Sequence, residues 1–321
     1  MAVPTVDAVV RAAGPHIASL MSRVEERLAE LASGHGSVLA EHAGATIAAG
    51  GKRLRPLLVF VAAGPEASGD GLVRAAVAVE LIHSATLVHD DVLDAAELRR
   101  GRPTVVATAG RDIATATGDL LFSRAFAELA RNGRADEVQV LSDASSALAE
   151  GELLQRADAW DATVPVDRYL RRCDLKTARL FEGACTLGAL ESGGDVADLA
   201  AFGRRVGLAF QLLDDVLDAS GPAERTGKTR GADLLDGTVT LPLILARERD
   251  ADLAAVDVRS VRSPTEAEAL CVRIEATGAL DEAKRRALAI VAEAKAELPE
   301  LRGSQREALE LVADGVVERY A

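Results

Sequence analysis

The chain is poor in aromatic residues and in cysteine. Aromatic side chains make up only 3% of its 321 residues, and there is a single tryptophan. Because β-sandwich cores draw on aromatic and β-branched side chains, this scarcity argues against an all-β fold. Cys173, Cys185 and Cys271 are odd in number and include no Cys-x-x-Cys pair. Neither a disulfide framework nor a zinc site is expected, and a reducing cytoplasm fits this pattern.

Excess positive charge and long apolar runs are also missing. The 37 Lys and Arg residues face 50 Asp and Glu residues, and the net charge of -13 argues against binding to nucleic acid or to anionic membranes. No run of 18 apolar residues occurs, and Asp7 and Arg11 interrupt the first apolar stretch, unlike a signal peptide. We therefore expect a soluble, cytoplasmic protein without stable membrane insertion.

What the chain does contain is a helical pattern. Hydrophobic residues form 49% of the sequence and recur every three or four positions through most of its length. No strand-like alternation and no repeat of 20 to 50 residues interrupts them. We predict an all-α fold in which residues 1–321 form a single large helical bundle. The expected helix joints are Gly64-Pro65, Gly101 to Pro103, Gly193-Gly194 and Gly221-Pro222, and Gly221 to Gly237 is expected to be a loop beside a functional site.

The string Asp-Asp-Val-Leu-Asp occurs twice, each time at the end of an apolar, helix-periodic stretch. The first and fifth residues of such a string share a helix face and the second is turned by about 100°, so we expect three carboxylates on a single side. Clustered carboxylates repel one another, and Mg²⁺ held by a few carboxylates and substrate phosphates relieves that repulsion. One copy in an acidic chain is ordinarily a solvated helix end, but two copies favour a metal site. The candidate metal ligands are Asp90, Asp91, Asp94, Asp214, Asp215 and Asp218.

Three groups of basic residues could neutralise a phosphate. They lie in Gly50 to Pro56, in Arg99 to Pro103, and at Lys176 and Lys228. Arginine binds phosphate oxygens in pairs, and lysine acts as a point charge. Each group alone is ordinary surface charge, but beside two acidic motifs they indicate a diphosphate site.

Six segments occur in an order that resembles the trans-isoprenyl (polyprenyl) diphosphate synthase family. The resemblance covers about Gly50 to Leu243 and is far more specific than a single acidic motif. The segments are GGKRLRP, ELIHSATLVHDDVLDAAELRRGRPT, EGELLQ, KTARLFEGACTLGAL, GLAFQLLDDVLD and GKTRGADLLDGTVTLPLI.

The resemblance implies a homodimer of the all-α isoprenoid synthase type, whose central cavity holds isopentenyl diphosphate and an allylic (geranyl, farnesyl or geranylgeranyl) diphosphate. Two to three Mg²⁺ ions are implied at the aspartate motifs. The implied ligands of isopentenyl diphosphate are Lys52, Arg55, His83 and Arg100, and those of the allylic diphosphate are Arg99, Lys176 and Lys228. Thr177 and Gln211 are implied near the reacting carbons, and the residues expected to carry catalysis are Lys176, Thr177, Gln211, Asp90 and Asp214.

The implied chemistry is ionisation, condensation and elimination. The allylic C–O bond ionises, the double bond of isopentenyl diphosphate attacks the cation, and loss of a proton completes the cycle. One departure is Thr238, which stands where many relatives carry a lysine; Arg225 or Arg230 is the expected substitute.

Product length is expected to depend on residues one turn before Asp90. Ala85 and Thr86 occupy that position, where short-product relatives commonly carry a bulky aromatic residue, and Phe122 and Phe126 offer a deeper stop unless they serve only as core. We expect a medium or long polyprenyl product of roughly six to ten isoprene units, with a short-chain product as the alternative.

Three other classes remain as rivals. A class I terpene cyclase needs no second diphosphate site, so Lys52, Arg55 and Arg100 disfavour it. Two intact acidic motifs disfavour a regulatory subunit of a heteromeric synthase. A di-iron bundle requires Glu and Glu-x-x-His on its inward faces, and the acidic helices offer aspartate pairs instead.

Overall fold

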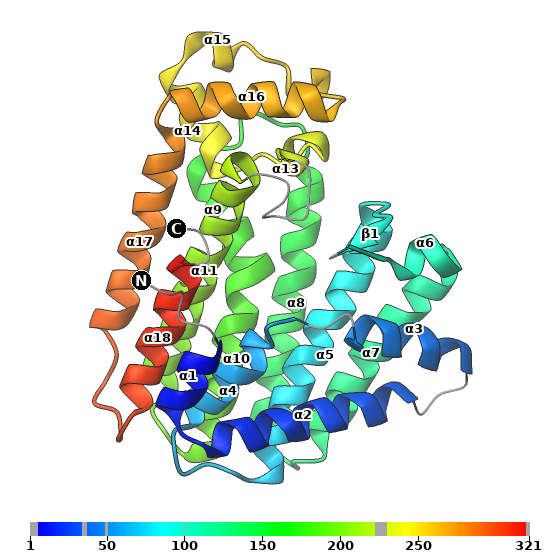
Figure 1. The fold of residues 1–321 in the computed structure, drawn as a ribbon, viewed down its shortest axis with the longest axis vertical. Coiled ribbons are helices and arrows are strands. Elements are labelled where there is room, and N and C mark those ends of the chain that lie inside the picture. The colour runs from blue at the N-terminus through cyan, green and yellow to red at the C-terminus, as the bar shows by residue number, and fades with distance from the viewer. Residues whose placement is uncertain (1–5, 34–36, 49–50, 100, 222–229, 319–321) are drawn as a thin grey trace. The chain divides into compact units, whose positions relative to one another are not determined.

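The computed structural model describes residues 6–33, 37–48, 51–99, 101–221 and 230–318, whose fold is drawn in Figure 1. In these ranges the only strands are β1 (Leu98–Arg99) and β2 (Arg102–Pro103), which pair antiparallel. All other regular elements are helices, so the predicted all-α fold is confirmed.

By its internal contacts the chain divides into two compact units, each assembled from segments distant in the sequence. Unit 1 comprises residues 1–146, 180–203 and 297–315, and unit 2 comprises residues 147–179, 204–296 and 316–321. The single domain expected from the sequence stays a prediction. Helices that contribute residues to both units are α8 (Ala135–Ala157), α10 (Arg179–Ser192), α11 (Val196–Ser220) and α18 (Gln305–Glu318).

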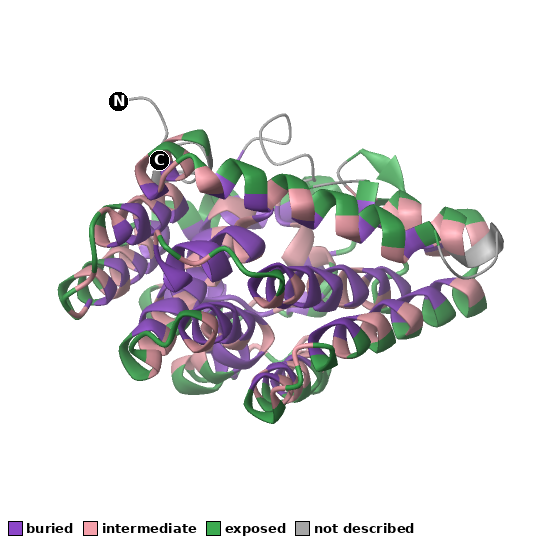
Figure 2. Cartoon of the chain, turned by 90° about the horizontal axis from the view of Figure 1, so that it is seen from below, coloured by how far each residue is buried: buried purple, intermediate pink, exposed green. Residues whose placement is uncertain are grey.

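Unit 1 is organised around helix α5. This helix packs along α7 and also contacts α2, α3, α4 and α6, while α1 contacts α2. Buried residues recur every three or four positions on α2, and Figure 2 shows helices with buried residues on one side and exposed residues on the other. The helices of this unit are α1 (Val6–Ala13), α2 (His16–Ser33), α3 (Ser37–Ala48), α4 (Leu54–Ala63), α5 (Asp70–Leu93), α6 (Val105–Ala109) and α7 (Arg111–Ala130).

Helix α5 is buried over most of its length. The helix has 24 residues and contains an 18-residue window whose mean hydropathy would suit a membrane span, but 72% of that window is buried inside the structure. An apolar helix buried on several sides needs no polar face, which explains its weak amphipathic pattern. The first acidic motif therefore ends a helix anchored in the core.

Unit 2 contains the second acidic motif and the helices that pack near it. Helix α14 contacts α9, α15, α16 and α17, and α16 also contacts α13 and α17. Its elements are α9 (Val166–Cys173), the π-helical turn η1 (Asp174–Ala178), α13 (Ala232–Leu235), α14 (Leu241–Arg249), α15 (Ala251–Ala254), η2 (Val258–Ser260), α16 (Pro264–Ala276) and α17 (Ala279–Ala296). Helix α13 interrupts the loop predicted from Gly221 to Gly237, and residues 222–229 of that loop lie outside the described part of the chain.

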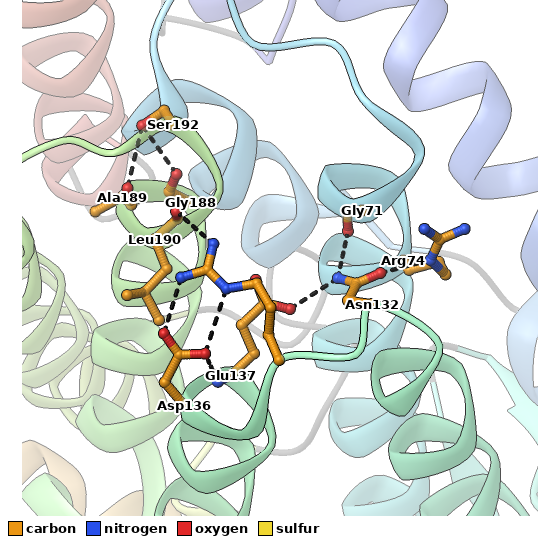
Figure 3. A network of polar contacts seen from close by, with 10 residues as sticks. Gly71, Arg74, Asn132, Asp136, Glu137, Gly188, Ala189, Leu190 and Ser192 are labelled. Atoms are coloured by element: carbon orange, nitrogen blue, oxygen red, sulfur yellow. Dashed lines mark hydrogen bonds and ion pairs between the residues drawn. The ribbon is translucent and has the colours of Figure 1, made fainter.

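A polar network joins the turn between α7 and α8 to α5, as Figure 3 shows. The Asn132 amide donates to the Gly71 carbonyl at 3.1 Å and to a Glu137 carboxylate oxygen at 2.7 Å, and it accepts from Arg74 at 2.5 Å. Glu137 is fully buried. Burial, followed by the neighbouring carboxylate of Glu191, raises the pKa of Glu137 to about 7.

Candidate functional site

The first acidic motif forms the C-terminal end of α5. Asp90 and Asp91 lie in the last turn and Asp94 is the C-cap residue. Asp94 is exposed and Asp90 is half-buried, but Asp91 is only 5% exposed. The Nε and Nη2 atoms of Arg99, each 2.7 Å away, bind Oδ1 of Asp91. Asp91 thus forms an ion pair with Arg99, a residue that we predicted to contact the allylic diphosphate.

The three cationic side chains between Gly50 and Pro56 have different surroundings. Arg53 is 8% exposed and adopts a left-handed φ of 45° just before α4. Its guanidinium binds Glu25 at 2.6 Å and Glu80 at 2.7 Å. Arg53 therefore anchors the segment, which the sequence did not reveal. Lys52 is exposed, whereas the guanidinium of Arg55 lies 4.8 Å from the centre of the Phe181 ring.

His83 and the proposed chain-length residues lie on α5 and α7. His83 is half-buried two turns before Asp90. Ala85 is fully buried, and half-buried Thr86 donates its hydroxyl proton to the His83 carbonyl at 2.8 Å.

The two phenylalanines of α7 are both half-buried. The Phe122 ring stacks on His89 with ring centres 5.7 Å apart, so it packs beside the residue preceding Asp90. Phe126 lies one helical turn further along α7. The stop that we proposed at these positions remains a prediction.

The second acidic motif lies on α11 in unit 2. Asp214 and Asp218 are half-buried, whereas Asp215 is 4% exposed. The Tyr169 hydroxyl donates to Oδ2 of Asp215 at 2.7 Å, and the Gln211 amide donates to Oδ1 at 2.8 Å. The middle aspartate of this motif is therefore also held within the protein.

This network continues to a second predicted residue. Thr177 donates its hydroxyl proton to Oε1 of Gln211 at 2.6 Å, so the structure brings these two predicted residues together. Tyr169 was not predicted, and no feature of its sequence environment pointed to it. Burial, and then the Asp233 carboxylate, raise the pKa of Asp215 to about 7. Burial likewise raises the pKa of Tyr169 well above its usual value.

Lys176 lies on the π-helical turn η1, a geometry often found at functional sites. Its ammonium group pairs with Glu152 and donates to Gln155 at 3.2 Å. Burial favours a higher pKa for Glu152, but Lys176 and Arg156 together outweigh it and the pKa is lowered. Gly151 permits this approach, because a Cβ atom there would lie 2.6 Å from the backbone nitrogen of Lys176. Glu152 belongs to the EGELLQ segment, which the sequence analysis identified. Its ion pair with Lys176 was not predicted.

The segment after α13 is held by the only tryptophan of the chain. The backbone N–H of Trp160 donates to the Gly237 carbonyl at 2.8 Å, and a Cβ atom at Gly237 would lie 2.3 Å from the indole ring. Thr238 is half-buried, and its backbone N–H donates to the Asp233 carbonyl at 2.8 Å.

Arg230, one of two residues expected to replace the missing lysine, is engaged elsewhere. Its guanidinium binds the Ala219 carbonyl and Glu275, each at 2.7 Å. The other candidate, Arg225, lies outside the described residues, as do Arg100 and Lys228.

The acidic motifs offer oxygen ligands of the kind that Mg²⁺ prefers. Among the described residues, no three His, Cys, Asp or Glu side chains form a ready-made metal site. In each motif, however, the first and last carboxylates are more exposed than the middle one. Two carboxylates completed by substrate phosphates and waters are a common magnesium ligand set, so these outer pairs fit the ion.

A scan against models of protein families matches the polyprenyl synthetase family over residues 37–271. Among characterised relatives, the chain is 42% identical to "heptaprenyl diphosphate synthase component 2" of Geobacillus stearothermophilus over 240 residues, 74% of this chain and 75% of the relative. It is 38% identical to geranylgeranyl diphosphate synthase of Methanosarcina mazei over 285 residues, 84% of this chain and 86% of the relative.

A solved structure agrees with these relatives. The polyprenyl synthase of Caulobacter crescentus, crystallised with calcium and isoprenyl diphosphate, is 36% identical, with a TM-score of 0.89 and coverage of 100% of both chains. Similarity at this level extends over the whole described fold, including the flanks for which the sequence indicated only helices.

Proposed function

Since the chain belongs to the polyprenyl synthetase family and is a prenyltransferase, we propose that it condenses isopentenyl diphosphate with an allylic diphosphate. The observation that carries this proposal is the cluster in unit 2. There Thr177 and Gln211 are hydrogen-bonded to each other beside the second acidic motif, and Lys176 lies on the same π-helical turn as Thr177. These residue types suit a site where a carbon–oxygen bond ionises beside a diphosphate.

The metal ligands in this proposal are first of all Asp90, Asp94, Asp214 and Asp218. Bound there, Mg²⁺ neutralises charge that develops on the departing diphosphate. Lys176 and Lys228 add positive charge, and Lys52, Arg55, His83 and Arg100 hold isopentenyl diphosphate. Thr177 and Gln211 present oxygen atoms towards the cationic carbons. Water must be kept out of the site, because it quenches the allylic cation.

Product length in this proposal is medium or long, roughly six to ten isoprene units. Thr86 supports it, because a side chain of this size at a half-buried position one turn before Asp90 leaves more room than an aromatic residue. The relatives include a heptaprenyl and a geranylgeranyl diphosphate synthase, so a short-chain product is the alternative.

We also propose that the enzyme is a cytoplasmic homodimer. Three free, buried cysteines support a reducing compartment. The name of the Geobacillus relative as a component makes a heteromeric assembly the alternative. Light scattering of the purified chain, followed by an activity assay without any added subunit, separates the two.

The decisive experiment incubates the purified protein with Mg²⁺, isopentenyl diphosphate and each allylic primer in turn. Geranyl, farnesyl and geranylgeranyl diphosphates are the primers, and mass spectrometry of dephosphorylated products gives the chain length. We expect consumption of isopentenyl diphosphate only when a primer is present. Consumption of a primer without isopentenyl diphosphate would indicate a cyclase, and no turnover by the chain alone would indicate a dependent subunit.

A further inference from the structure

In both aspartate motifs the middle carboxylate is buried and held by other residues of the protein. In the first motif Asp91 is buried and bound by Arg99, and in the second Asp215 is buried and bound by Tyr169 and Gln211. The first and last aspartates of each motif are more exposed. We propose that Asp215 is a positioning residue rather than a metal ligand, and that it fixes the direction in which Thr177 donates its hydroxyl proton. This inference rests on the proposed prenyl transfer.

The direction of the hydrogen bonds follows from the chemistry of the carboxylate. An ionised aspartate can only accept hydrogen bonds, so Gln211 must turn its NH₂ group towards Asp215. Its carbonyl oxygen then faces Thr177, whose hydroxyl has to be the donor, as the structure shows at 2.6 Å. Tyr169 occupies the second carboxylate oxygen as another donor.

Burial makes this arrangement rigid. Tyr169 is completely buried, Asp215 is 4% exposed and Thr177 is 6% exposed. A buried network with matched donors and acceptors resists reversal, because a reversed group leaves a polar atom unsatisfied. The amide of Gln211 therefore has one favourable orientation, set by Asp215.

The consequence for catalysis concerns the lone pairs of Thr177. Once its proton is directed to Gln211, the hydroxyl oxygen offers only lone pairs to any other group. Lone pairs stabilise a cationic carbon, whereas a hydroxyl proton pointing at that carbon repels it. Asp215 thus acts on the reaction through Gln211 and Thr177 without touching substrate.

The test reverses the network without removing it. Asp215→Asn keeps the shape of the side chain and still accepts from Tyr169, but it turns an NH₂ group towards Gln211. The Gln211 amide then flips, and Thr177 accepts its hydrogen bond and turns its own proton outward. At about pH 8 we expect kcat to fall roughly 10- to 100-fold, with an unchanged KM for both substrates.

A second substitution restores the original direction. In Asp215→Asn/Gln211→Glu the new carboxylate accepts from Asn at one oxygen and from Thr177 at the other, and the net charge is that of the wild type. We expect kcat to recover to within about 5-fold of the wild type. If the single variant fails to fold, the folded double variant alone decides: near-normal kcat supports the proposal, and a loss as large as 10-fold or more overturns it.

The matched control is Asp214→Asn, at the neighbouring carboxylate that we assign to the metal. Binding of Mn²⁺ in the presence of inorganic diphosphate, measured by calorimetry, should weaken in Asp214→Asn and stay at the wild-type value in Asp215→Asn. Equal weakening in both variants overturns the proposal, as does a double variant no more active than Asp215→Asn. If the wild type shows no condensation at all, the proposed function is wrong, and the Mn²⁺ titration still decides whether Asp215 is a ligand.

Discussion

Thr238 stands at the position where many members of this family carry a lysine. Arg230 does not replace that charge in this structure, because its guanidinium binds the Ala219 carbonyl and Glu275. We predict that Thr238→Lys leaves kcat/KM for the allylic substrate intact or raises it, since an added ammonium attracts the diphosphate. Steady-state kinetics with a fixed concentration of isopentenyl diphosphate measure this. A large loss of turnover would show that Gly237 to Pro242 is wrongly aligned with the family.

Thr86 gives a prediction about product length. A phenylalanine there places a ring one helical turn before Asp90, where a growing chain has to pass if it runs along α5. We predict that Thr86→Phe shortens the product, as measured by mass spectrometry. Ala127→Phe is the control, because Ala127 is exposed on α7 beside Phe126. Equal product lengths in Thr86→Phe and the wild type would remove this model of the cavity floor.

Thr177 and Gln211 were predicted from the resemblance of their segments to a known family, and the structure joins them by a hydrogen bond. Their roles in catalysis stay predictions. The expectation that all three carboxylates of each motif lie on a single side stays a prediction, and it did not reveal that Asp91 and Asp215 are buried. The partners that bury them, Arg99 and Tyr169, come from other elements, and a helical pattern contains no information about such contacts.

Among the elements, helix ends were predictable where glycine or proline interrupts the apolar period. Helix α4 ends at Ala63, α10 at Ser192 and α11 at Ser220, each directly before a predicted break. The break at Gly101 to Pro103 differs, because β1 and β2 form a two-stranded pair there. The π-helical turn η1 was not predictable, since its residues follow the same apolar period as an α-helix.

The close approach of α8 to η1 depends on Gly151. An alanine would place its Cβ atom 2.6 Å from the backbone of Lys176, so one of the two elements has to move. We predict that Gly151→Ala lowers the free energy of unfolding by about 1–3 kcal/mol and lowers kcat, because Lys176 shifts with its backbone. Urea denaturation and steady-state kinetics measure both effects. Ser146→Ala, an exposed change on the same helix, should alter neither.

The junction of α7 and α8 gives a prediction about pH. The pKa of Glu137 is raised from 4.5 to about 7, first by burial and then by Glu191, so the folded protein holds this proton more tightly than the unfolded chain. The stabilisation from that proton is complete below about pH 4.5 and is lost as the pH rises through 7.

We therefore predict that Glu137→Gln reduces the decline in stability between about pH 4.5 and 7, by on the order of 1–2 kcal/mol relative to the wild type. Urea denaturation at several pH values measures the difference. Asp143→Asn, at an exposed position on the same helix, is the control. Parallel stability curves for Glu137→Gln and the wild type would mean that this carboxyl titrates alike in the folded and unfolded states.

At the scale of the whole molecule, metal binding and folding should be separable. The cores of both units consist of buried apolar side chains, so removal of Mg²⁺ with EDTA should abolish turnover but hardly change the Tm of the free protein. Mg²⁺ together with inorganic diphosphate should raise the Tm, because ligand at 100 times its Kd stabilises the fold by about 2.7 kcal/mol. Differential scanning calorimetry with each component alone and with both measures this. An increase with Mg²⁺ alone as large as with both would contradict the role of phosphate as a shared ligand.

The fold class of the whole molecule followed from composition and apolar period, because an all-α chain leaves that signature everywhere in its sequence. The division of the chain into two compact units could not be predicted in this way. Each unit combines segments more than a hundred residues apart, such as residues 1–146 with 297–315. No local pattern encodes such an association, which depends on which apolar faces meet.

The indole of Trp160, which lies against Gly237, is an intrinsic fluorescent probe. The chain has no other tryptophan, so ultraviolet emission excited near the red edge of absorption comes from this one place. Its surroundings include the backbone that leads from α13 to α14. Stopped-flow emission can therefore follow that segment in real time during turnover, and competing compounds can be ranked without a radioactive substrate or an attached dye.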